Sequence, residues 1–265
     1  MSTSALSGRT VLVVFAHPDD EAIACGGTLA RAADEGARVV LLCATRGGYG
    51  SVSDAALVAG AAIERVRARE LDAAAEILGI AEVILLAHGD GYLRWNAPGF
   101  DADLATVLAR IRPDAVITFD ADGLYWHGDH IGIHERTTTA VATLGAGAPP
   151  LYYVTLPRGA MRGVVEAARA RGGELADATF WGIDPDAFGA EAEPASFTVD
   201  VGVWAERKLG AIQAHATQVG VRSPFAWIDA GDARRWLGVE LFRRAPIQSD
   251  RPDVLERLAE GVASR

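Results

Sequence analysis

The sequence is poor in cysteine, and this limits the ways in which the fold can be held together. Only Cys25 and Cys43 occur in 265 residues, which excludes a framework of disulfide bonds. The two do not form a CxxC pair, so we do not expect a thiolate metal site. Both lie in apolar surroundings, and we expect two buried, reduced thiols in a cytoplasmic protein.

Basic residues and long apolar runs are also scarce. The chain has 25 Lys and Arg against 35 Asp and Glu, a formal net charge of −10. Nucleic acids and anionic membranes attract a basic surface, so we expect neither as a partner. The longest apolar runs, 11–16 and 39–44, are far shorter than the roughly 18 residues of a membrane span. The first residues lack the apolar stretch of a signal peptide, so we expect a cytoplasmic protein without membrane insertion.

Apolar residues make up half of the chain, which suits a sizeable core and excludes a disordered protein. In the first two thirds, short apolar runs alternate with helical patterns, as in parallel sheets covered by helices on both faces. We therefore predict an α/β, Rossmann-like three-layer fold with a mostly parallel central sheet. The predicted strands are 9–16, 38–44, 82–87, 114–119 and 151–155, and the predicted helices are 21–36, 63–78, 101–111 and 130–144.

The last third of the chain is less regular. Residues 181–194 are rich in Pro, Gly and acids and predict a loop. A strand is predicted at 197–201, with helices at 204–215 and 254–260. We predict a single domain over 1–265, with a flexible tail at 1–8 and a less regular part at 180–265. The sequence leaves open whether the chain forms a homo-oligomer.

Two clusters of polar residues follow predicted strands. The sequence AHPDDE at 16–21 follows the first strand, and YWHGDH at 125–130 follows the fourth. Helix capping explains one acid, but not a histidine with three acids. Parallel strands open onto the same edge of a sheet, so the two clusters can converge. Histidine and aspartate with one open position form the ligand set of a catalytic zinc, and the residues therefore predict a metal site.

These motifs resemble the PIG-L/LmbE-like family of zinc-dependent N-acetylglucosaminyl de-N-acetylases. The AHPDDE motif and the HxDH motif at 127–130 are intact, and the resemblance extends from residue 9 to about 218. It implies a hydrolase that removes the acetyl or another acyl group from an N-acylated amino sugar or related small amide. Its partner would be a small N-acetylated sugar or sugar conjugate. Looser matches are Arg69-Glu70, Leu78-Gly79, Asp90-Gly91 and the set Lys208, His215 and Gln218.

The resemblance implies a metal centre and a general base. His17, Asp20 and His130 would hold Zn²⁺ or another divalent transition metal. Asp19 would take a proton from the metal-bound water. The residues agree with this division, because successive side chains at a helix start diverge by about 100°. One of the two aspartates can bind the metal while the other faces the water, which zinc brings to a pKa of about 7.

The resemblance also assigns residues around the substrate. His127, in its protonated form, would stabilise the oxyanion or protonate the departing amine, for which histidine is the usual donor near neutral pH. Tyr125 would lie near the substrate carbonyl, and Asp129 would orient or charge a histidine. Arg69 and Asp90 would contact the sugar. Taken without the family, Arg69 belongs to a charged helix face that is normally solvated.

Four further residues are ambiguous. His134 follows His130 by four positions on one helix face, and we favour a structural or substrate-rim role. Glu21 is expected to support the site or the helix start without binding the metal. For His88 a place in the pocket and a solvated loop stay open. For His215 site support and a purely structural role stay open.

One segment departs from the family. Many members have TxGExG after the second strand, whereas this chain has TRGGYG at 45–50, with Gly48 in place of Glu. The loop borders the expected site, so we expect differences in substrate recognition or loop order. The metal and base positions are unaffected.

Two other functions fit parts of the sequence. A non-catalytic metal- or sugar-binding protein of this fold would not need Asp19. A nucleotide-binding oxidoreductase would need a GxGxxG turn after the first strand, where this chain instead has acids that would repel a pyrophosphate.

Overall fold

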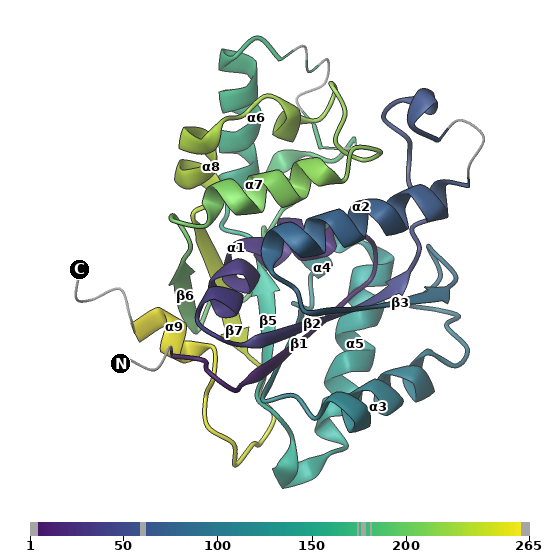
Figure 1. Ribbon diagram of the computed structural model, residues 1–265, viewed down its shortest axis with the longest axis vertical. Coiled ribbons are helices and arrows are strands. Elements are labelled where there is room, and N and C mark those ends of the chain that lie inside the picture. Colours follow the sequence, from purple (N-terminus) through teal and green to yellow (C-terminus); the bar gives the residue numbers. More distant parts are fainter. Residues whose placement is uncertain (1–4, 59–61, 174, 176–178, 181, 261–265) are drawn as a thin grey trace.

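A seven-stranded sheet runs through the middle of the molecule (Figure 1). The computed structural model describes residues 5–58, 62–173, 175, 179–180 and 182–260. The strand order is β3-β2-β1-β4-β5-β7-β6, in which β1 to β5 are parallel and β7 is antiparallel to both neighbours. This confirms the predicted mostly parallel sheet. The strands are β1 (Thr10–Phe15), β2 (Arg38–Thr45), β3 (Glu82–His88), β4 (Ala115–Phe119), β5 (Leu151–Thr155), β6 (Phe197–Asp200) and β7 (Val239–Arg244).

Helices cover both faces of the sheet and complete the predicted three layers. One face carries α1, α2 and α7, and the other carries α3 and α5 (Figure 1). Helices α6 and α8 pack together beside α7. The helices are α1 (Asp20–Asp34), α2 (Ile63–Leu78), α3 (Phe100–Ile111), α4 (Gly123–Trp126), α5 (Gly128–Ala142), α6 (Ala160–Ala170), α7 (Ala205–Ala214), α8 (Ala230–Leu237) and α9 (Glu256–Glu260).

The inner strands match their sequence patterns because both of their faces are covered. All residues of β4 and β5 are buried, and in β1 only Thr10 is partly exposed. Helix α2 also has the predicted limits, since Gly79 adopts a left-handed φ of 77° directly after it and ends it. Buried apolar residues form one cluster that extends from Leu6 to Leu258.

Four of the described helices and strands were not predicted. These are α4, α6, α8 and β7. Strand β7 mixes apolar and charged residues, because Glu240 is buried in an ion pair and Arg243 bonds Asp120. Its position between β5 and β6 makes the far edge of the sheet antiparallel.

The predicted flexible tail at 1–8 is wrong for residues 5–8. Leu6 is fully buried, and its N–H donates to the carbonyl of Glu35 at 3.0 Å. The hydrophobic effect therefore anchors this segment to the end of α1. Residues 1–4 lie outside the described part of the chain.

Both cysteines are buried and unpaired, as predicted. Among the described helices, none combines the length and the apolar character needed to cross a membrane.

A buried ion pair ties α1 to the C-terminal strands. Helix α1 is interrupted at Cys25, where φ is −146°, and the N–H groups of Gly27 and Thr28 donate to Glu240 at 2.9 and 2.7 Å. Lys208 of α7 donates to the same carboxylate at 2.6 Å. Gly27 permits this approach, since a Cβ there would lie 2.5 Å from Val201.

We expect Lys208→Met to destabilise the protein, because it leaves Glu240 buried without its cation. The free energy of unfolding should fall by about 3–5 kcal/mol, as measured by chemical denaturation. The double variant Lys208→Met/Glu240→Gln should recover part of this loss, because it removes the uncompensated charge. A single variant at least as stable as the double variant would contradict the expectation.

Candidate metal centre

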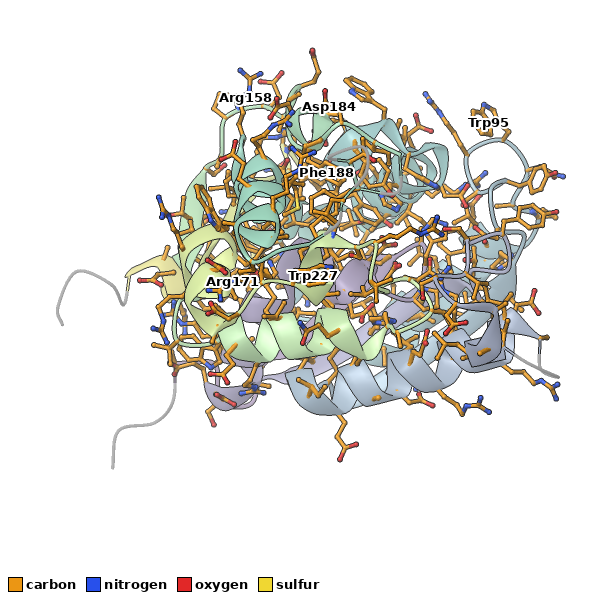
Figure 2. The ribbon with its side chains drawn as sticks, turned by 90° about the horizontal axis from the view of Figure 1, so that it is seen from above. Trp95, Arg158, Arg171, Asp184, Phe188 and Trp227 are labelled. Carbon is orange, nitrogen blue, oxygen red and sulfur yellow. The ribbon has the colours of Figure 1, made fainter. Side chains whose placement is uncertain are left out.

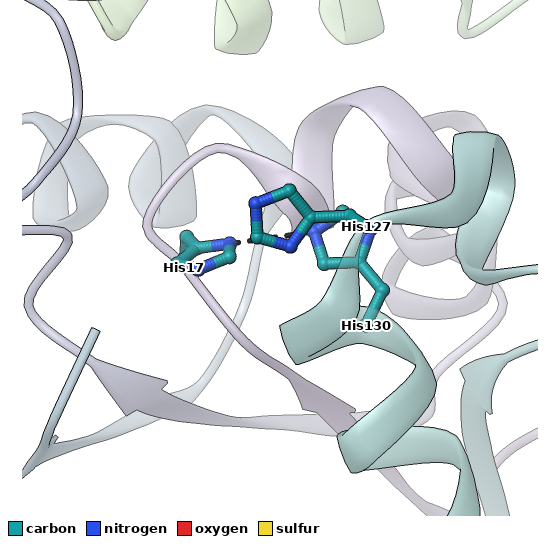
Figure 3. Close-up of side chains that lie close together, drawn as sticks. All are labelled: His17, His127 and His130. Atoms are coloured by element: carbon teal, nitrogen blue, oxygen red, sulfur yellow. Dashed lines mark hydrogen bonds between the residues drawn. The ribbon is translucent and has the colours of Figure 1, made fainter. Parts of the chain in front are cut away.

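The two polar clusters meet at the carboxyl ends of the neighbouring strands β1 and β4. His17 comes from the β1–α1 turn and Asp20 is the first residue of α1. His130 comes from the first turn of α5, which begins two residues earlier than predicted. His130 Nε2 lies 3.1 Å from Asp20 Oδ1 and 3.3 Å from His17 Nδ1, and His17 Nδ1 lies 3.4 Å from Asp20 Oδ2. Figure 3 shows the rings of the two histidines close together, with His127 beside them.

The spacing of the two ring nitrogens and the nearest oxygens of Asp20 is close to that of the ligands of a tetrahedral metal ion. With bonds of about 2.0–2.1 Å, as for zinc, tetrahedral ligand atoms lie roughly 3.3–3.4 Å apart. His17, Asp20 and His130 are all buried, and two imidazoles with one carboxylate leave the fourth position open. The residues therefore fit a divalent transition metal without rearrangement.

Hydrogen bonds orient both imidazoles from behind. His130 Nδ1 lies 3.0 Å from the carbonyl of Gly123, and its ring stacks on Phe119. His17 Nε2 lies 3.2 Å from Asp129 and 3.1 Å from Asp90. Asp129 is held in turn by the N–H groups of Gly91 and Leu93. Each ring is thus directed so that its other nitrogen faces the metal position, the usual arrangement around metal-bound histidine.

Acidic groups outnumber the two ligand histidines in this small volume. Burial disfavours the charged form of His17, but Asp129, Asp20 and Asp90 outweigh it and raise the pKa of His17 well above its usual value. Burial likewise opposes ionisation of Asp20, yet His130 and His17 hold the pKa of Asp20 well below its usual value. The site is therefore electrostatically suited to a cation.

Asp19 stands beside the triangle in a strained backbone conformation. Its φ of 123° lies in a region that non-glycine residues rarely adopt, at a cost of about 1–3 kcal/mol. Its carboxylate lines the cavity and accepts a bond from Arg67 at 3.1 Å. Burial raises the pKa of Asp19 to about 6, although Arg67 opposes the shift. A carboxylate of this kind can exchange a proton near neutral pH.

The arginine that lines the cavity is Arg67, whereas Arg69, the predicted sugar contact, lies outside the cavity lining. Arg67 is buried, and it donates to the carbonyls of Gly47 and Pro18 as well as to Asp19. Arg69 is exposed and does not line the cavity. Side chains two positions apart on a helix, such as Arg67 and Arg69, point about 200° away from each other around the helix axis. The helical period could have identified Arg67, because it shares the buried face of α2 with Leu71 and Ala74.

His127 differs from its expected protonated state. Its Nδ1 accepts the N–H of Asp129 at 3.2 Å at the start of α5, so the hydrogen of the neutral ring is on Nε2. Burial, with the nearby His130 and His17, lowers the pKa of His127 to about 4. His127 is therefore a neutral imidazole at pH 7 that lines the cavity and can donate a hydrogen bond.

Tyr125 and Asp90, both expected near the substrate, line this cavity as well. The cavity has a volume of about 310 Å³. The Tyr125 ring packs on Phe188, which lies among the interior side chains in Figure 2. Burial, with Asp20 and Asp19 nearby, raises the pKa of Tyr125 well above its usual value and keeps its hydroxyl protonated. Leu124 and Trp126, which precede and follow Tyr125 in the sequence, both have positive φ. The backbone is therefore strained at this turn as well as at Asp19.

A second cavity of about 390 Å³ adjoins the first and shares Tyr49 and Asp90 with it. Its lining includes Gly48, the position at which the sequence departs from the family, and Glu64. A Cβ at Gly48 would lie 2.6 Å from Glu64 Oε1. The carboxylate of Glu64, from the first turn of α2, thus occupies the space that a side chain at position 48 would need. The other lining residues are Arg46, Ala87, His88, Gly89 and Tyr92.

The structure separates the roles of the remaining histidines. His134 bonds the carbonyl of Phe119 and packs on Tyr153, which is a structural role. His88 bonds Asp103 and lines the second cavity. His215 is fully buried and lies 2.7 Å from Glu21.

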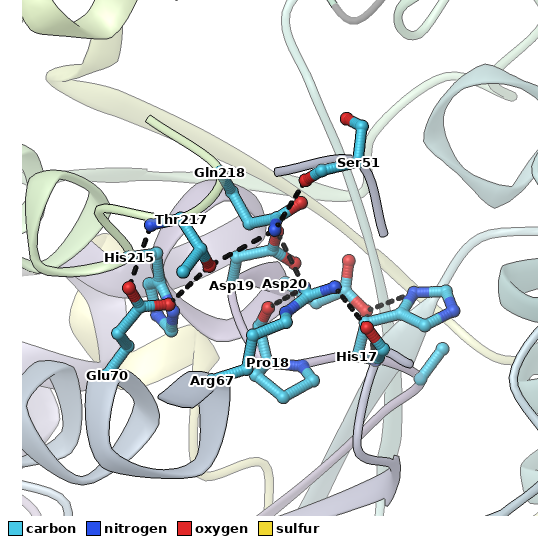
Figure 4. A network of polar contacts seen from close by, with 12 residues as sticks. His17, Pro18, Asp19, Asp20, Ser51, Arg67, Glu70, His215, Thr217 and Gln218 are labelled. Atoms are coloured by element: carbon cyan, nitrogen blue, oxygen red, sulfur yellow. Dashed lines mark hydrogen bonds and ion pairs between the residues drawn. The ribbon is translucent and has the colours of Figure 1, made fainter. Parts of the chain in front are cut away.

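Hydrogen bonds connect the segment after α7 to helix α2 and to the loop that follows β2 (Figure 4). Thr217 donates to Glu70 of α2 through its N–H and its hydroxyl, at 2.8 and 2.6 Å. Gln218 donates to the carbonyl of Ser51 and lines the first cavity. Sequence reasoning missed Glu70 and Thr217 as site supports, because neither touches the cavity and their contact spans 147 residues.

Comparisons with known proteins agree with this geometry. The family described as "PIG-L: GlcNAc-PI de-N-acetylase" matches residues 12–141. The 1D-myo-inositol 2-acetamido-2-deoxy-alpha-D-glucopyranoside deacetylase of Acidothermus cellulolyticus is 33% identical over 256 residues, covering 88% of each chain.

Two solved structures share the fold. The N,N'-diacetylchitobiose deacetylase of Pyrococcus horikoshii is 23% identical, with a TM-score of 0.61 over 90% of this chain and 84% of its own. The 4-carboxy-2-hydroxymuconate hydratase GalB of Pseudomonas putida is 21% identical, with a TM-score of 0.60 over 89% of this chain and 96% of its own. Since the hydratase shares the fold, the fold by itself does not define the reaction.

We expect Asp129→Asn to weaken metal binding by about 10–100-fold, because Asp129 orients His17. The measurement is a calorimetric titration of the chelator-stripped protein with Zn²⁺. His88→Asn, in the second cavity, is the control and should bind like the wild type. Equal affinities of the Asp129 variant and the wild type would contradict the role of Asp129.

Proposed function

Because this chain belongs to the PIG-L family of de-N-acetylases, we propose that it is a metal-dependent hydrolase that removes the acetyl group from an N-acetylated amino sugar or its conjugate. One observation carries the proposal. His17, Asp20 and His130 form a triangle with tetrahedral spacing, and His17 and Asp20 line a cavity together with Asp19, a partly buried carboxylate outside the triangle.

We propose that the resident metal is Zn²⁺, held by His17, Asp20 and His130, because two imidazoles and one carboxylate are common ligands of catalytic zinc. When bound, the ion supplies an acidified water molecule and polarises the amide carbonyl. Asp19 accepts the proton as the water oxygen bonds to the carbonyl carbon. Arg67 favours the ionised form of Asp19 that this step requires.

The other cavity residues stabilise the charge that develops on the carbonyl oxygen. His127 donates through Nε2–H and Tyr125 through its hydroxyl. The C–N bond then breaks, and the proton held by Asp19 passes to the departing amine. The products are acetate and the free amino sugar. In this proposal His127 acts as a neutral donor, in contrast to the protonated histidine expected from the resemblance.

The second cavity is the proposed site for the group attached to the amino sugar. Tyr49 and Tyr92 are largely exposed, with ring centroids 6.2 Å apart, and sugar-like rings commonly stack on such faces. Arg46 and Glu64 add a cation and a carboxylate that can bond hydroxyl groups. The Acidothermus relative is named for an acetamido sugar joined to inositol. A conjugate with a second polyol ring is therefore the substrate class we propose.

We expect Asp19→Asn to abolish most of the turnover, with a loss of about 10²–10⁴-fold in kcat, because the general base is lost. The assay measures amine release from N-acetylglucosamine and from N-acetylglucosaminyl-inositol, and metal content is measured in parallel. Undiminished turnover by the variant would contradict this mechanism. A wild type that binds metal and these sugars without releasing amine would favour the alternative of a non-catalytic binding protein.

The two arginines of α2 offer a matched pair for a further test. We expect Arg67→Met to lower kcat/KM by about 100-fold, because Asp19 loses both its cation and its support. Arg69→Met, on the exposed face, should stay within about twofold of the wild type. Equal losses in the two variants would show that the site does not depend on Arg67.

A further inference from the structure

The start of helix α1 departs from ordinary helix capping in a way that frees Asp19. The residue before a helix usually has extended backbone and caps the first turn with its side chain. Asp19 instead has a φ of 123°, and its side chain makes no capping hydrogen bond. Its carboxylate is therefore available to the cavity, where it meets Arg67.

Glu21 holds this turn from inside the protein. Its Oε2 accepts the backbone N–H of Asp19 at 3.0 Å. The carbonyl of Asp19 meanwhile accepts the N–H groups of Ala22 and Ile23 at 3.2 and 3.1 Å, so both of its backbone polar groups are bonded. Glu21 is only 1% exposed, which means that its orientation depends on its protein partners and not on water.

His215 is the second partner of the Glu21 carboxylate. Its Nε2 lies 2.7 Å from Glu21 Oε1, and both side chains are buried. The position of His215 is itself fixed, because its N–H bonds the carbonyl of Ile212 at the end of α7 and Thr217 bonds Glu70 two residues later. A continuous chain of contacts thus runs from α7 through Glu21 to the backbone of Asp19.

We propose that His215 is a positioning residue for the catalytic base, which acts through Glu21 to keep Asp19 in its left-handed backbone conformation. The proposal rests on the proposed function, in which Asp19 is the base. His215 does not line the cavity, so it touches neither the substrate nor the metal position. Its effect should therefore appear in the rate of the chemical step and not in substrate or metal binding.

A second buried acid, Glu240 of β7, bonds the same helix and provides a matched control. Glu240 is also 1% exposed, accepts two backbone N–H groups of α1 and pairs with a buried cation, Lys208. Its contacts are at Gly27 and Thr28, in the second half of the helix, and not at Asp19. Loss of Glu240 thus perturbs the packing of α1 without removing the support of residue 19.

The test compares His215→Gln with His215→Met. The two side chains have similar length and volume, but only glutamine can donate an N–H to Glu21. We expect kcat to fall by about 100-fold in His215→Met and by less than about fivefold in His215→Gln, with KM and metal content of both near the wild-type values. Glu240→Gln should lower the unfolding midpoint while kcat stays within about twofold.

A crystal structure of His215→Met gives a readout that does not require activity, and we expect φ of Asp19 to leave the positive region. Should His215→Met fail to fold, Glu21→Asp tests the same link, because its shorter carboxylate cannot reach both partners, and we expect the same selective loss of kcat.

Three outcomes would overturn the proposal: equal kcat in the Gln and Met variants, loss of kcat in parallel with loss of metal, or an equal loss of kcat in Glu240→Gln. A wild type without any amine release would instead refute the proposed function, so the two failures are distinguishable.

Discussion

Negative charge buried at the carboxyl edge of the sheet is the constraint around which the structure is arranged. A carboxylate removed from water is costly unless a cation or several hydrogen-bond donors compensate it. Each buried acid here has such a partner: Asp129 has two backbone N–H groups, Asp19 has Arg67, Glu70 has Thr217, and Glu240 has Lys208. Asp20 faces two histidines, and the position between these three residues completes the compensation when a cation fills it.

Much of the fold and the centre of the site could be predicted from local patterns. Continuous apolar strands such as β1 and a helix that ends at a glycine, such as α2, are determined by nearby residues. His17 and His130 could be paired because parallel strands open onto one edge. The choice between Arg67 and Arg69 required knowing which face of α2 meets Asp19, and the structure shows that it is the face of Arg67. The protonation state of His127 depends on its hydrogen bond from the N–H of Asp129, which the sequence does not reveal. Strand β7 escaped prediction because its buried charge is compensated by a residue from a distant helix.

Strain and support are divided between different parts of the chain. Two residues with positive φ, Asp19 and Leu124, line the cavity, whereas Glu21, which accepts the N–H of Asp19, lies behind it. Local strain of this kind persists only where the surroundings over-determine it. At the neighbouring cavity, the carboxylate of Glu64 lies beside Gly48.

The contact between His215 and Glu21 joins residues 194 positions apart. All three metal-facing residues lie in the first half of the chain, but one of the groups that secure the turn carrying the base, His215, is made much later. During synthesis the ribosome must therefore release most of the last third before the site can reach its final geometry. Long-range closures of this kind are slow steps in folding. The turn that carries Asp19 thus depends for its geometry on the docking of α7, although the residues of the turn itself are adjacent in the sequence.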